Sequence, residues 1–275
     1  MARISIITIS YNNKAGLEKT IESVLSQTGV GFEYIVIDGN SSDGSKEVIA
    51  RYKDRIDFAL SEPDSGIYNA MNKGIRAAKG DYLLFLNSSD TLLEPDTLNK
   101  AAALIDGQYD FYYGNQIYMS GRTNQIEYWI APEAVSLGFF IDNSLPHQAT
   151  FIRRTLFDRL GMYNENLKIA SDWEFFVTAI CLHKASYKHI GMVVADYDFT
   201  GISSNPNSYG LVQSEKKSVL EARFGLSPED FDLMTEMKLK RVGHLLHIKK
   251  FRWPWKLLKG FANVLLLFLP KPPKR

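Results

Sequence analysis

The chain has 275 residues, of which 45% are hydrophobic and 23% are charged. This length and composition are typical of an ordinary folded protein that buries a full core. The single cysteine, Cys181, excludes an internal disulfide framework and is compatible with a reducing compartment.

The net charge of +1 conceals an uneven distribution along the chain. From Met237 onward there are 11 lysine or arginine residues and no acidic residue, which leaves 21 basic and 31 acidic residues before that point. The body therefore has a net charge of −10 and the tail one of +11. This asymmetry predicts an anionic surface as the partner of the tail alone.

Strand and helix patterns alternate through the first ninety residues. Apolar runs predict strands at residues 4–9, 32–37, 57–60 and 81–86. Helical spacing predicts helices around residues 17–25, 45–52 and 67–79, with Gly80 ending the third of these helices. The alternating order predicts an α/β fold with a mainly parallel sheet, right-handed crossovers and helices on both faces.

Three polar loops follow these strands, at residues 8–13, 38–43 and 87–90. The carboxyl ends of parallel strands lie at one edge of a sheet, where open α/β sheets bind ligands. The last loop, Asn-Ser-Ser-Asp, ends in Asp90, which is either a cation ligand or a turn residue that caps a helix. Phosphate-loop and dinucleotide glycine patterns are missing after the first strand, which argues against both of those enzyme classes.

The chain after residue 95 is less regular. A helix is predicted to residue 105, a strand at 110–113 and a helix at 171–183. Residues 116–209 are richer in aromatics and short strands, and we interpret them as a second part built against the same sheet edge. Residues 1–115, 116–209 and 210–275 are therefore the predicted divisions of the chain.

Five segments together resemble the family-2 inverting glycosyltransferases of the GT-A fold, in particular the bacterial members that build capsule, exopolysaccharide and lipopolysaccharide sugars. The segments are SIITISYN at 5–12, EYIVIDGNSSDG at 33–44, SEPDSGIYNAMNKG at 61–74, GDYLLFLNSSD at 80–90 and ASDWEFF at 170–176. They occur in the order and at the spacing of the family. The resemblance implies a nucleotide-sugar-binding half at 1–115 and an acceptor half at 116–209.

The resemblance also implies which residues bind the donor nucleotide: Thr8, Ser10, Tyr11, Asp38, Asp64, Lys73 and Ser89. In this assignment the tyrosine ring covers the base. Asp38 accepts a hydrogen bond from a base N–H, which favours a uridine nucleotide. The alternatives are a turn or capping role for Asp38 and a solvated surface position for Lys73.

A divalent cation, Mg²⁺ or Mn²⁺, is implied as cofactor at the position of Asp90. This loop has one carboxylate where the family usually has two, so we expect the metal to arrive largely with the sugar nucleotide. His147, in LPHQAT at 145–150, is implied as a further metal ligand or a phosphate donor. A structural histidine that bonds a loop carbonyl is the alternative.

Asp172 matches the family's general base, which removes the proton of the acceptor hydroxyl. Glu174 is close enough to share that role, and Asp172 would also suit the first turn of a helix without any catalytic role. Trp129 and Trp173 are more often core residues than platforms for a sugar.

Basic residues of the tail recur at helical spacing among Trp and Leu, and the uncharged run at 260–269 is about half of the roughly 20 residues that a spanning helix needs. We therefore expect a helix that lies on an anionic membrane surface, with a helix folded back on the domain as the alternative. A nucleic-acid partner is not expected. The predicted location is cytoplasmic, peripheral on the inner membrane.

These observations predict transfer of a sugar from a nucleotide diphosphate sugar, with UDP favoured, to a glycan or polyprenyl-linked acceptor. A non-catalytic protein that binds sugar nucleotides or glycans is the alternative from another class. A sugar nucleotidyltransferase is disfavoured because residues 8–13 contain no glycine.

Overall fold

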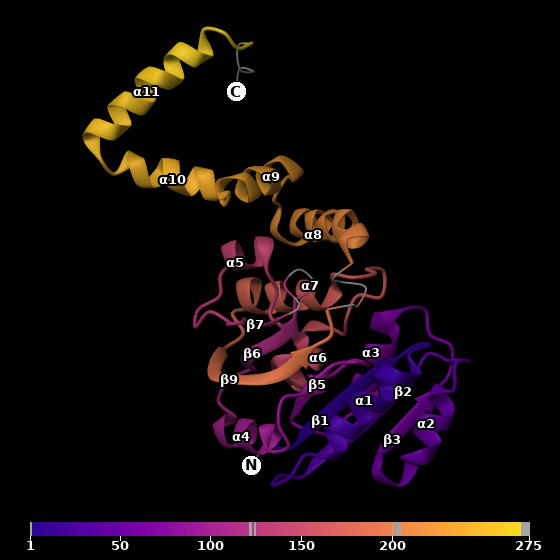
Figure 1. Cartoon of the computed structure of the whole chain (residues 1–275). Helices are drawn as coiled ribbons and strands as arrows, with labels where there is room; N and C mark the ends of the chain where they lie inside the picture. Colours follow the sequence, from indigo (N-terminus) through magenta and orange to yellow (C-terminus); the bar gives the residue numbers. More distant parts are fainter. Residues whose placement is uncertain (1, 121–122, 124, 200, 202–204, 271–275) are drawn as a thin grey trace.

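A computed structural model describes residues 2–120, 123, 125–199, 201 and 205–270 (Figure 1). Three basic residues of the predicted tail, Lys271, Lys274 and Arg275, lie outside the described residues.

Nine strands form one sheet within these residues, in the order β3-β2-β1-β4-β8-β6-β9-β5, with β7 paired to β6 (Figure 1). Their bounds are β1 Ile4–Ser10, β2 Phe32–Asp38, β3 Phe58–Ser61, β4 Tyr82–Phe85, β5 Thr91–Leu92, β6 Phe111–Met119, β7 Ile126–Trp129, β8 Thr150–Arg153 and β9 Tyr187–Tyr197.

The helices of the domain are α1 Lys14–Leu25, α2 Ser45–Arg51, α3 Ile67–Ala77, α4 Thr97–Leu104, α5 Leu137–Asp142, α6 Thr155–Leu160 and α7 Ser171–Val177. A π-helical turn, Thr178–Leu182, continues α7. Short 3-10 turns lie at Lys53–Arg55, His147–Ala149 and Pro206–Ser208. The C-terminal helices are α8 Tyr209–Phe224, α9 Pro228–Met237, α10 Lys240–Lys249 and α11 Arg252–Leu266.

The sheet is parallel in its first half and mixed beyond it. Strands β3, β2, β1 and β4 pair in parallel, as predicted. Strand β8 is then antiparallel to both β4 and β6. The α/β class is thus confirmed, but the sheet is mixed instead of mainly parallel, because β8 enters between β4 and β6 in the opposite direction.

Helices cover both faces of the sheet, as predicted. On β1, Ile7 and Ile9 belong to the core cluster under α3, whereas Ile4 and Ile6 belong to the cluster that contains α1. Alternate residues of a strand point to opposite faces, so a strand that is buried at every position, as β1 is, is covered on both faces. This double burial holds the carboxyl ends of the parallel strands in place.

Gly80 does not end the helix before β4, and that prediction was wrong. Helix α3 ends at Ala77, and Ala78 already has an extended backbone with φ −70° and ψ 137°. Gly80 instead allows a close approach of two backbones, since a Cβ there would lie 2.7 Å from the Ser5 nitrogen and 2.9 Å from the Arg3 carbonyl oxygen.

The C-terminal helices differ in how they contact the domain. In α8, Val219 and Leu220 are buried in the core, and in α9 Phe231 is buried. Helices α10 and α11 bury no residue and extend away from the domain (Figure 1). Among the described residues no helix is long and apolar enough to cross a membrane.

Candidate active site

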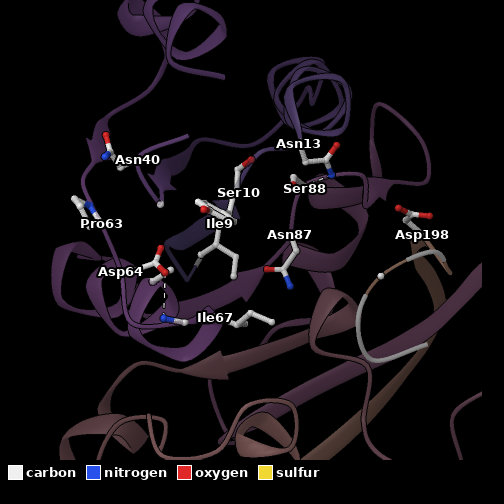
Figure 2. A pocket seen from close by; sticks show the side chains of 15 residues that line it. Ile9, Ser10, Asn13, Asn40, Pro63, Asp64, Ile67, Asn87, Ser88 and Asp198 are labelled. Atoms are coloured by element: carbon white, nitrogen blue, oxygen red, sulfur yellow. Dashed lines mark hydrogen bonds between the residues drawn. The ribbon is translucent and has the colours of Figure 1, made fainter. Parts of the chain in front are cut away.

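A cleft of about 760 Å³ lies at the carboxyl edge of the parallel strands (Figure 2). The three polar loops predicted to converge do so here. The loop after β1 contributes Ser10, Tyr11 and Asn13, the loop after β2 contributes Gly39 and Asn40, and the loop after β4 contributes Asn87 and Ser88. The turn before α3 and Asp198, at the end of β9, complete the cleft.

The residues after β1 divide between the cleft and the core. Tyr11 is 67% exposed at the rim, so its ring is accessible to a ligand. Ser10 is buried beneath the cleft, and its hydroxyl has no hydrogen-bond partner among the described residues. Thr8 is fully buried away from the cleft and accepts a hydrogen bond from the Tyr34 hydroxyl at 3.1 Å. Of the three, Tyr11 can therefore meet a nucleoside directly, whereas Ser10 lines the cleft with its hydroxyl buried.

Asp38 is fully buried at the end of β2. Its carboxylate accepts hydrogen bonds from the Ser41 amide at 3.0 Å, the Ser41 hydroxyl at 2.5 Å and the Ser61 hydroxyl at 2.6 Å. These bonds shape the turn that carries Gly39 and Asn40 into the cleft. These bonds occupy three of the roughly four acceptor positions of the buried carboxylate. A contact between Asp38 and a nucleotide base stays a prediction.

Asp64 lines the cleft and Lys73 does not. The Asp64 carboxylate accepts a hydrogen bond from the Gly66 amide at 3.1 Å, drawn as a dashed line in Figure 2. The Lys73 ammonium donates to the Pro63 carbonyl at 2.8 Å and pairs with Glu62 at 3.0 Å. Lys73 thus holds the turn that positions Asp64 in the cleft.

Ser89 connects the loop after β4 to α1. Its backbone has a left-handed φ of 86°, its amide donates to the Thr20 hydroxyl at 2.9 Å, and its own hydroxyl accepts from Asn13 at 3.0 Å. Asn13 also caps α1 by accepting from the Gly16 amide. Ser88, the neighbour of Ser89, is the serine that lines the cleft.

Asp172 lies at the start of α7, where the helix dipole favours a negative charge. The Tyr68 hydroxyl donates to its Oδ1 at 2.8 Å, and His147 Nδ1 lies 3.5 Å from its Oδ2. Burial by itself would raise the pKa of Asp172, but the hydrogen bonds and charge of His147 and the Tyr68 bond outweigh it, so the pKa is lowered. The carboxylate is held ionised, as a general base requires.

His147 bridges Asp172 and the loop after β4. Its Nε2 lies 3.1 Å from Asn87 Nδ2, so both ring nitrogens have partners. Burial by itself lowers the pKa of His147. The hydrogen bond and charge of Asp172 and the charge of Asp90 raise it by more, so the pKa lies above its ordinary value. With both nitrogens engaged, His147 is placed to orient Asp172; its predicted role as a metal ligand would require it to give up one of these contacts.

Glu174 is directed to a different part of the molecule. It is buried, accepts a hydrogen bond from Asn164 at 3.1 Å and pairs with Arg223 at 3.1 Å. It lines none of the described cavities that Asp172 lines. The geometry therefore favours Asp172 over Glu174 as a base.

A family model described as glycosyl transferase family 2 matches residues 5–161, more than half of the chain. The chain belongs to glycosyl transferase family 2. It is 34% identical over 207 residues to an uncharacterized glycosyltransferase of Mycobacterium tuberculosis, which covers 74% of this chain and 77% of the relative. It is 33% identical over 207 residues to the PGL/p-HBAD biosynthesis glycosyltransferase of Mycobacterium bovis, covering 73% of this chain and 78% of the relative.

Solved structures share the fold of this glycosyltransferase. TarS 1-349 of Staphylococcus aureus in complex with UDP-GlcNAc has a TM-score of 0.60 at 19% identity, covering 90% of this chain and 79% of that one. The mannosyltransferase PcManGT of Pyrobaculum calidifontis, in complex with GDP-Man and Mn²⁺, has a TM-score of 0.58 at 16% identity, covering 96% and 81%. At these identities the likeness concerns the GT-A fold alone.

The oxygen ligands of the glycosyltransferase suit a divalent cation held jointly with a diphosphate. A cavity of about 110 Å³ next to the cleft is lined by Asn87, Asp90, His147, Asp172 and Asp198. Asp90 is buried and accepts a hydrogen bond from the Asp198 amide at 2.9 Å. Burial raises the pKa of Asp90 to about 7, and the nearby charges of His147 and Lys19 offset this only in part.

The Asn87 side-chain oxygen, Oδ1, is buried without a hydrogen-bond partner in the described part of the chain. No group of three or more His, Cys, Asp or Glu side chains that could hold a metal occurs among the described residues. The described side chains alone therefore do not complete a metal site. The oxygens of Asp90, Asp198 and Asn87 line the same cavity and suit part of the ligand set of a cation whose other ligands are phosphate and water.

Asp198 was not predicted as a site residue of this glycosyltransferase. Its sequence signal is an acidic residue at the end of the apolar strand β9, which is the same signal that identified Asp38 and Asp90. The pairing of β9 with both β6 and β5 brings this strand end to the cleft. That pairing joins segments far apart in the sequence and is decided only on folding.

Another cavity, of about 280 Å³, is lined by Asp172 and His147 and extends toward α8. Trp129, Trp173, Tyr197 and Lys216 also line it. Trp173 is buried and donates from its indole nitrogen to the Phe140 carbonyl at 2.7 Å, whereas Trp129 is partly exposed. Asp172 thus lies between the cavity next to the donor cleft and this one.

Proposed function

We propose that this glycosyltransferase is an inverting, metal-assisted enzyme that moves a sugar from a nucleotide diphosphate sugar, with UDP favoured, to a glycan or lipid-linked glycan acceptor. The observation that carries the proposal is the position of Asp172. Its carboxylate is ionised and lines both the cavity next to the cleft and the 280 Å³ cavity. A base in that position lies between a donor and an acceptor.

The proposed reaction is a direct displacement at the anomeric carbon. Asp172 removes the proton of the acceptor hydroxyl as that oxygen forms its bond to the anomeric carbon. The bond from that carbon to the diphosphate breaks on the opposite face, and the nucleoside diphosphate leaves with the electron pair. Attack from the face opposite the leaving group inverts the anomeric configuration.

Positioning of the base is assigned to Tyr68 and His147, which hold the two carboxylate oxygens of Asp172. On the donor side, Tyr11 and Asp64 are placed to bind the nucleoside. The complexes of TarS with UDP-GlcNAc and of PcManGT with GDP-Man support a nucleotide diphosphate sugar as the donor by analogy of fold. Asp90, Asp198 and Asn87 would hold the cation, which when bound neutralises charge on the diphosphate.

The biological setting is proposed from the relatives. One relative is named for PGL/p-HBAD biosynthesis, and a relative from Bacillus subtilis, at 28% identity over 146 residues, is named as a putative teichuronic acid biosynthesis glycosyltransferase. Together with the basic tail, these names support surface-glycan synthesis at the cytoplasmic face of the inner membrane. The tail would hold the enzyme next to a lipid-linked acceptor.

The test is Asp172→Asn in the full chain. We expect transfer to fall by about 10²–10⁴-fold, the usual contribution of a general base. UDP binding, measured by calorimetry with Mn²⁺, should stay within about threefold of the wild type, because Asp172 does not line the donor cleft. Glu174→Gln is not a matched control, since Glu174 is buried and pairs with Arg223; Glu221→Gln, at an exposed position of α8, is used instead.

Two outcomes would contradict the proposal. If Asp172→Asn transfers sugar at the wild-type rate, Asp172 is not the general base. Donor binding without nucleotide release from any UDP- or GDP-sugar, in the presence of a panel of glycan acceptors and Mn²⁺, would favour a binding protein instead of an enzyme.

A further inference from the structure

Lys216 is a buried lysine of α8. The residue is 6% exposed, and its Nζ lies 4.9 Å from the centre of the Trp173 ring. Within the described part of the chain its ammonium makes no hydrogen bond or ion pair. Buried lysines are rare unless they are paired, because burial removes the hydration of the ammonium.

The neighbouring carboxylates already have other partners. Asp142 pairs with Lys238 at 2.8 Å, and Asp172 is held by Tyr68 and His147. Glu215, next to Lys216 in sequence, accepts from three backbone amides. Burial lowers the pKa of Lys216 to about 8, and the charges of Asp172 and Asp142 offset this only in part.

The ammonium borders the 280 Å³ cavity that Asp172 also lines. Trp129 and Tyr197 give this cavity aromatic walls, on which the apolar face of a sugar can pack. Gln116 and Gln148 line it too and are joined by a hydrogen bond of 2.6 Å. Its volume is near the lower end of small-molecule sites, roughly 300–1,000 Å³, which suits one sugar unit.

We propose that this cavity binds the acceptor sugar and that Lys216 selects an acceptor carrying a negative charge, either a carboxylate or a phosphate ester. The inference rests on the proposed function, because it takes Asp172 as the base that the acceptor hydroxyl reaches. Lys216 supplies the counter-charge for the acceptor, and the acceptor's anion supplies the partner that the buried ammonium lacks.

Three sugar probes separate the possible sources of the charge: methyl glucoside, which is neutral, methyl glucuronide, which carries a carboxylate, and glucose 6-phosphate. Their binding to the full chain is measured by calorimetry with saturating UDP and Mn²⁺, so that anion binding in the donor cleft is blocked. We expect at least one anionic probe to bind at least tenfold more tightly than the neutral probe. The preferred anion identifies the acceptor class.

Variants of α8 test whether Lys216 causes this preference. Lys216→Met keeps an apolar contact with Trp173 and should abolish the preference, whereas Lys216→Arg should keep it. Lys217→Met is the matched control, since Lys217 pairs with Asp232 on the outer side of the same helix and should leave the preference unchanged. Thermal unfolding of each variant checks that it is folded.

The inference is overturned if neither anionic probe binds more tightly than the neutral one, or if Lys216→Met retains the preference. These outcomes are independent of the proposed function. Binding of anionic sugars without sugar transfer would support the anion-selective pocket and contradict the proposed enzyme activity. Sugar transfer without any charge preference would support the activity and contradict the role of Lys216.

Discussion

At the residue scale, four side chains connect the proposed donor and acceptor sides of the site. Asn87 contacts His147, His147 contacts Asp172, and Asp172 accepts from Tyr68. When His147 Nδ1 carries the proton toward Asp172, its Nε2 can accept from the Asn87 amide, which leaves Asn87 Oδ1 facing away from the histidine. The hydrogen-bond chain therefore couples the orientation of the base to that of a candidate cation ligand.

The Tyr68 hydrogen bond predicts a pH effect on transfer. It contributes to the lowered pKa of Asp172, and a general base acts only when it is deprotonated. Activity should thus fall as pH drops through the pKa of Asp172. Tyr68→Phe removes the bond and raises that pKa, so the acid limb of the kcat/KM profile should move to higher pH. Tyr128→Phe, at an exposed position, should leave the limb unchanged; an unmoved limb in Tyr68→Phe would contradict the assigned role.

At the scale of elements, α8 is part of the site even though it follows the predicted boundary at residue 209. Glu215 is 8% exposed and accepts from the backbone amides of Lys168, Ile169 and Ala170, at 2.7, 3.1 and 2.9 Å. These amides lie just before α7, and those of Ile169 and Ala170 would otherwise be buried without partners. Helix α8 thus fixes the segment that leads to Asp172.

Removal of the Glu215 carboxylate should destabilise the domain. Glu215→Ala leaves buried amides unsatisfied, and each such group costs about 1–3 kcal/mol, so we expect the free energy of unfolding to fall by at least about 2 kcal/mol. Urea denaturation measures the change. Glu221→Ala, at an exposed position of the same helix, should change it by less than about 0.5 kcal/mol. Equal effects of the two substitutions would show that the amide contacts add nothing.

The packing of α3 on β1 depends on a glycine. A Cβ at Gly74 would lie 2.4 Å from Ile7 Cγ2, so α3 must shift if a methyl group is added. Gly74→Ala should therefore destabilise the protein by about 1–3 kcal/mol, although alanine is the better helix former. At Gly210, in α8, a Cβ meets nothing within 4 Å, and Gly210→Ala should be neutral or stabilising by up to about 1 kcal/mol. Thermal and urea unfolding compare the pair; stabilisation by Gly74→Ala would refute the packing argument.

At the scale of the whole molecule, charge and apolar surface are separated from the catalytic domain. Helices α10 and α11 extend from the domain and bury no residue (Figure 1). Exposed apolar side chains gather on α11, including Trp253 at 75% and Leu257 at 70%, between the basic residues Arg252, Lys256 and Lys259. Exposed apolar and basic groups on one helix are typical of attachment to an anionic lipid surface.

Vesicle binding tests this arrangement. The full chain should float with vesicles that contain phosphatidylglycerol and bind phosphatidylcholine vesicles much more weakly. Each basic residue near such a surface contributes about 1 kcal/mol, so Lys256→Gln with Lys259→Gln should weaken binding by roughly tenfold or more. The matched control is Lys53→Gln with Lys79→Gln, at exposed positions of the acidic body. Equal losses in the two double variants, or no preference for the anionic lipid, would contradict a specific role of the tail.

The pattern of the chain was sufficient to predict the parallel half of the sheet and the meeting of its three polar loops. Local periodicity identifies doubly buried strands such as β1, and parallel strands necessarily place their carboxyl ends at one edge. The basic charge of the tail could also be predicted from the sequence, because net charge depends on composition alone. The family's motifs added the catalytic candidates Asp90 and Asp172.

Only the tertiary structure decided how those residues are partnered. Asp38, Lys73 and Ser89 proved to be held by neighbouring side chains or backbone, and Glu174 was separated from Asp172 by its contact with Arg223. Strand β9 and helix α8, which lie far along the chain, bring Asp198 and Lys216 to the site. The physical reason is that burial and hydrogen-bond partners depend on contacts between distant segments, whereas strand and helix patterns depend on neighbouring residues.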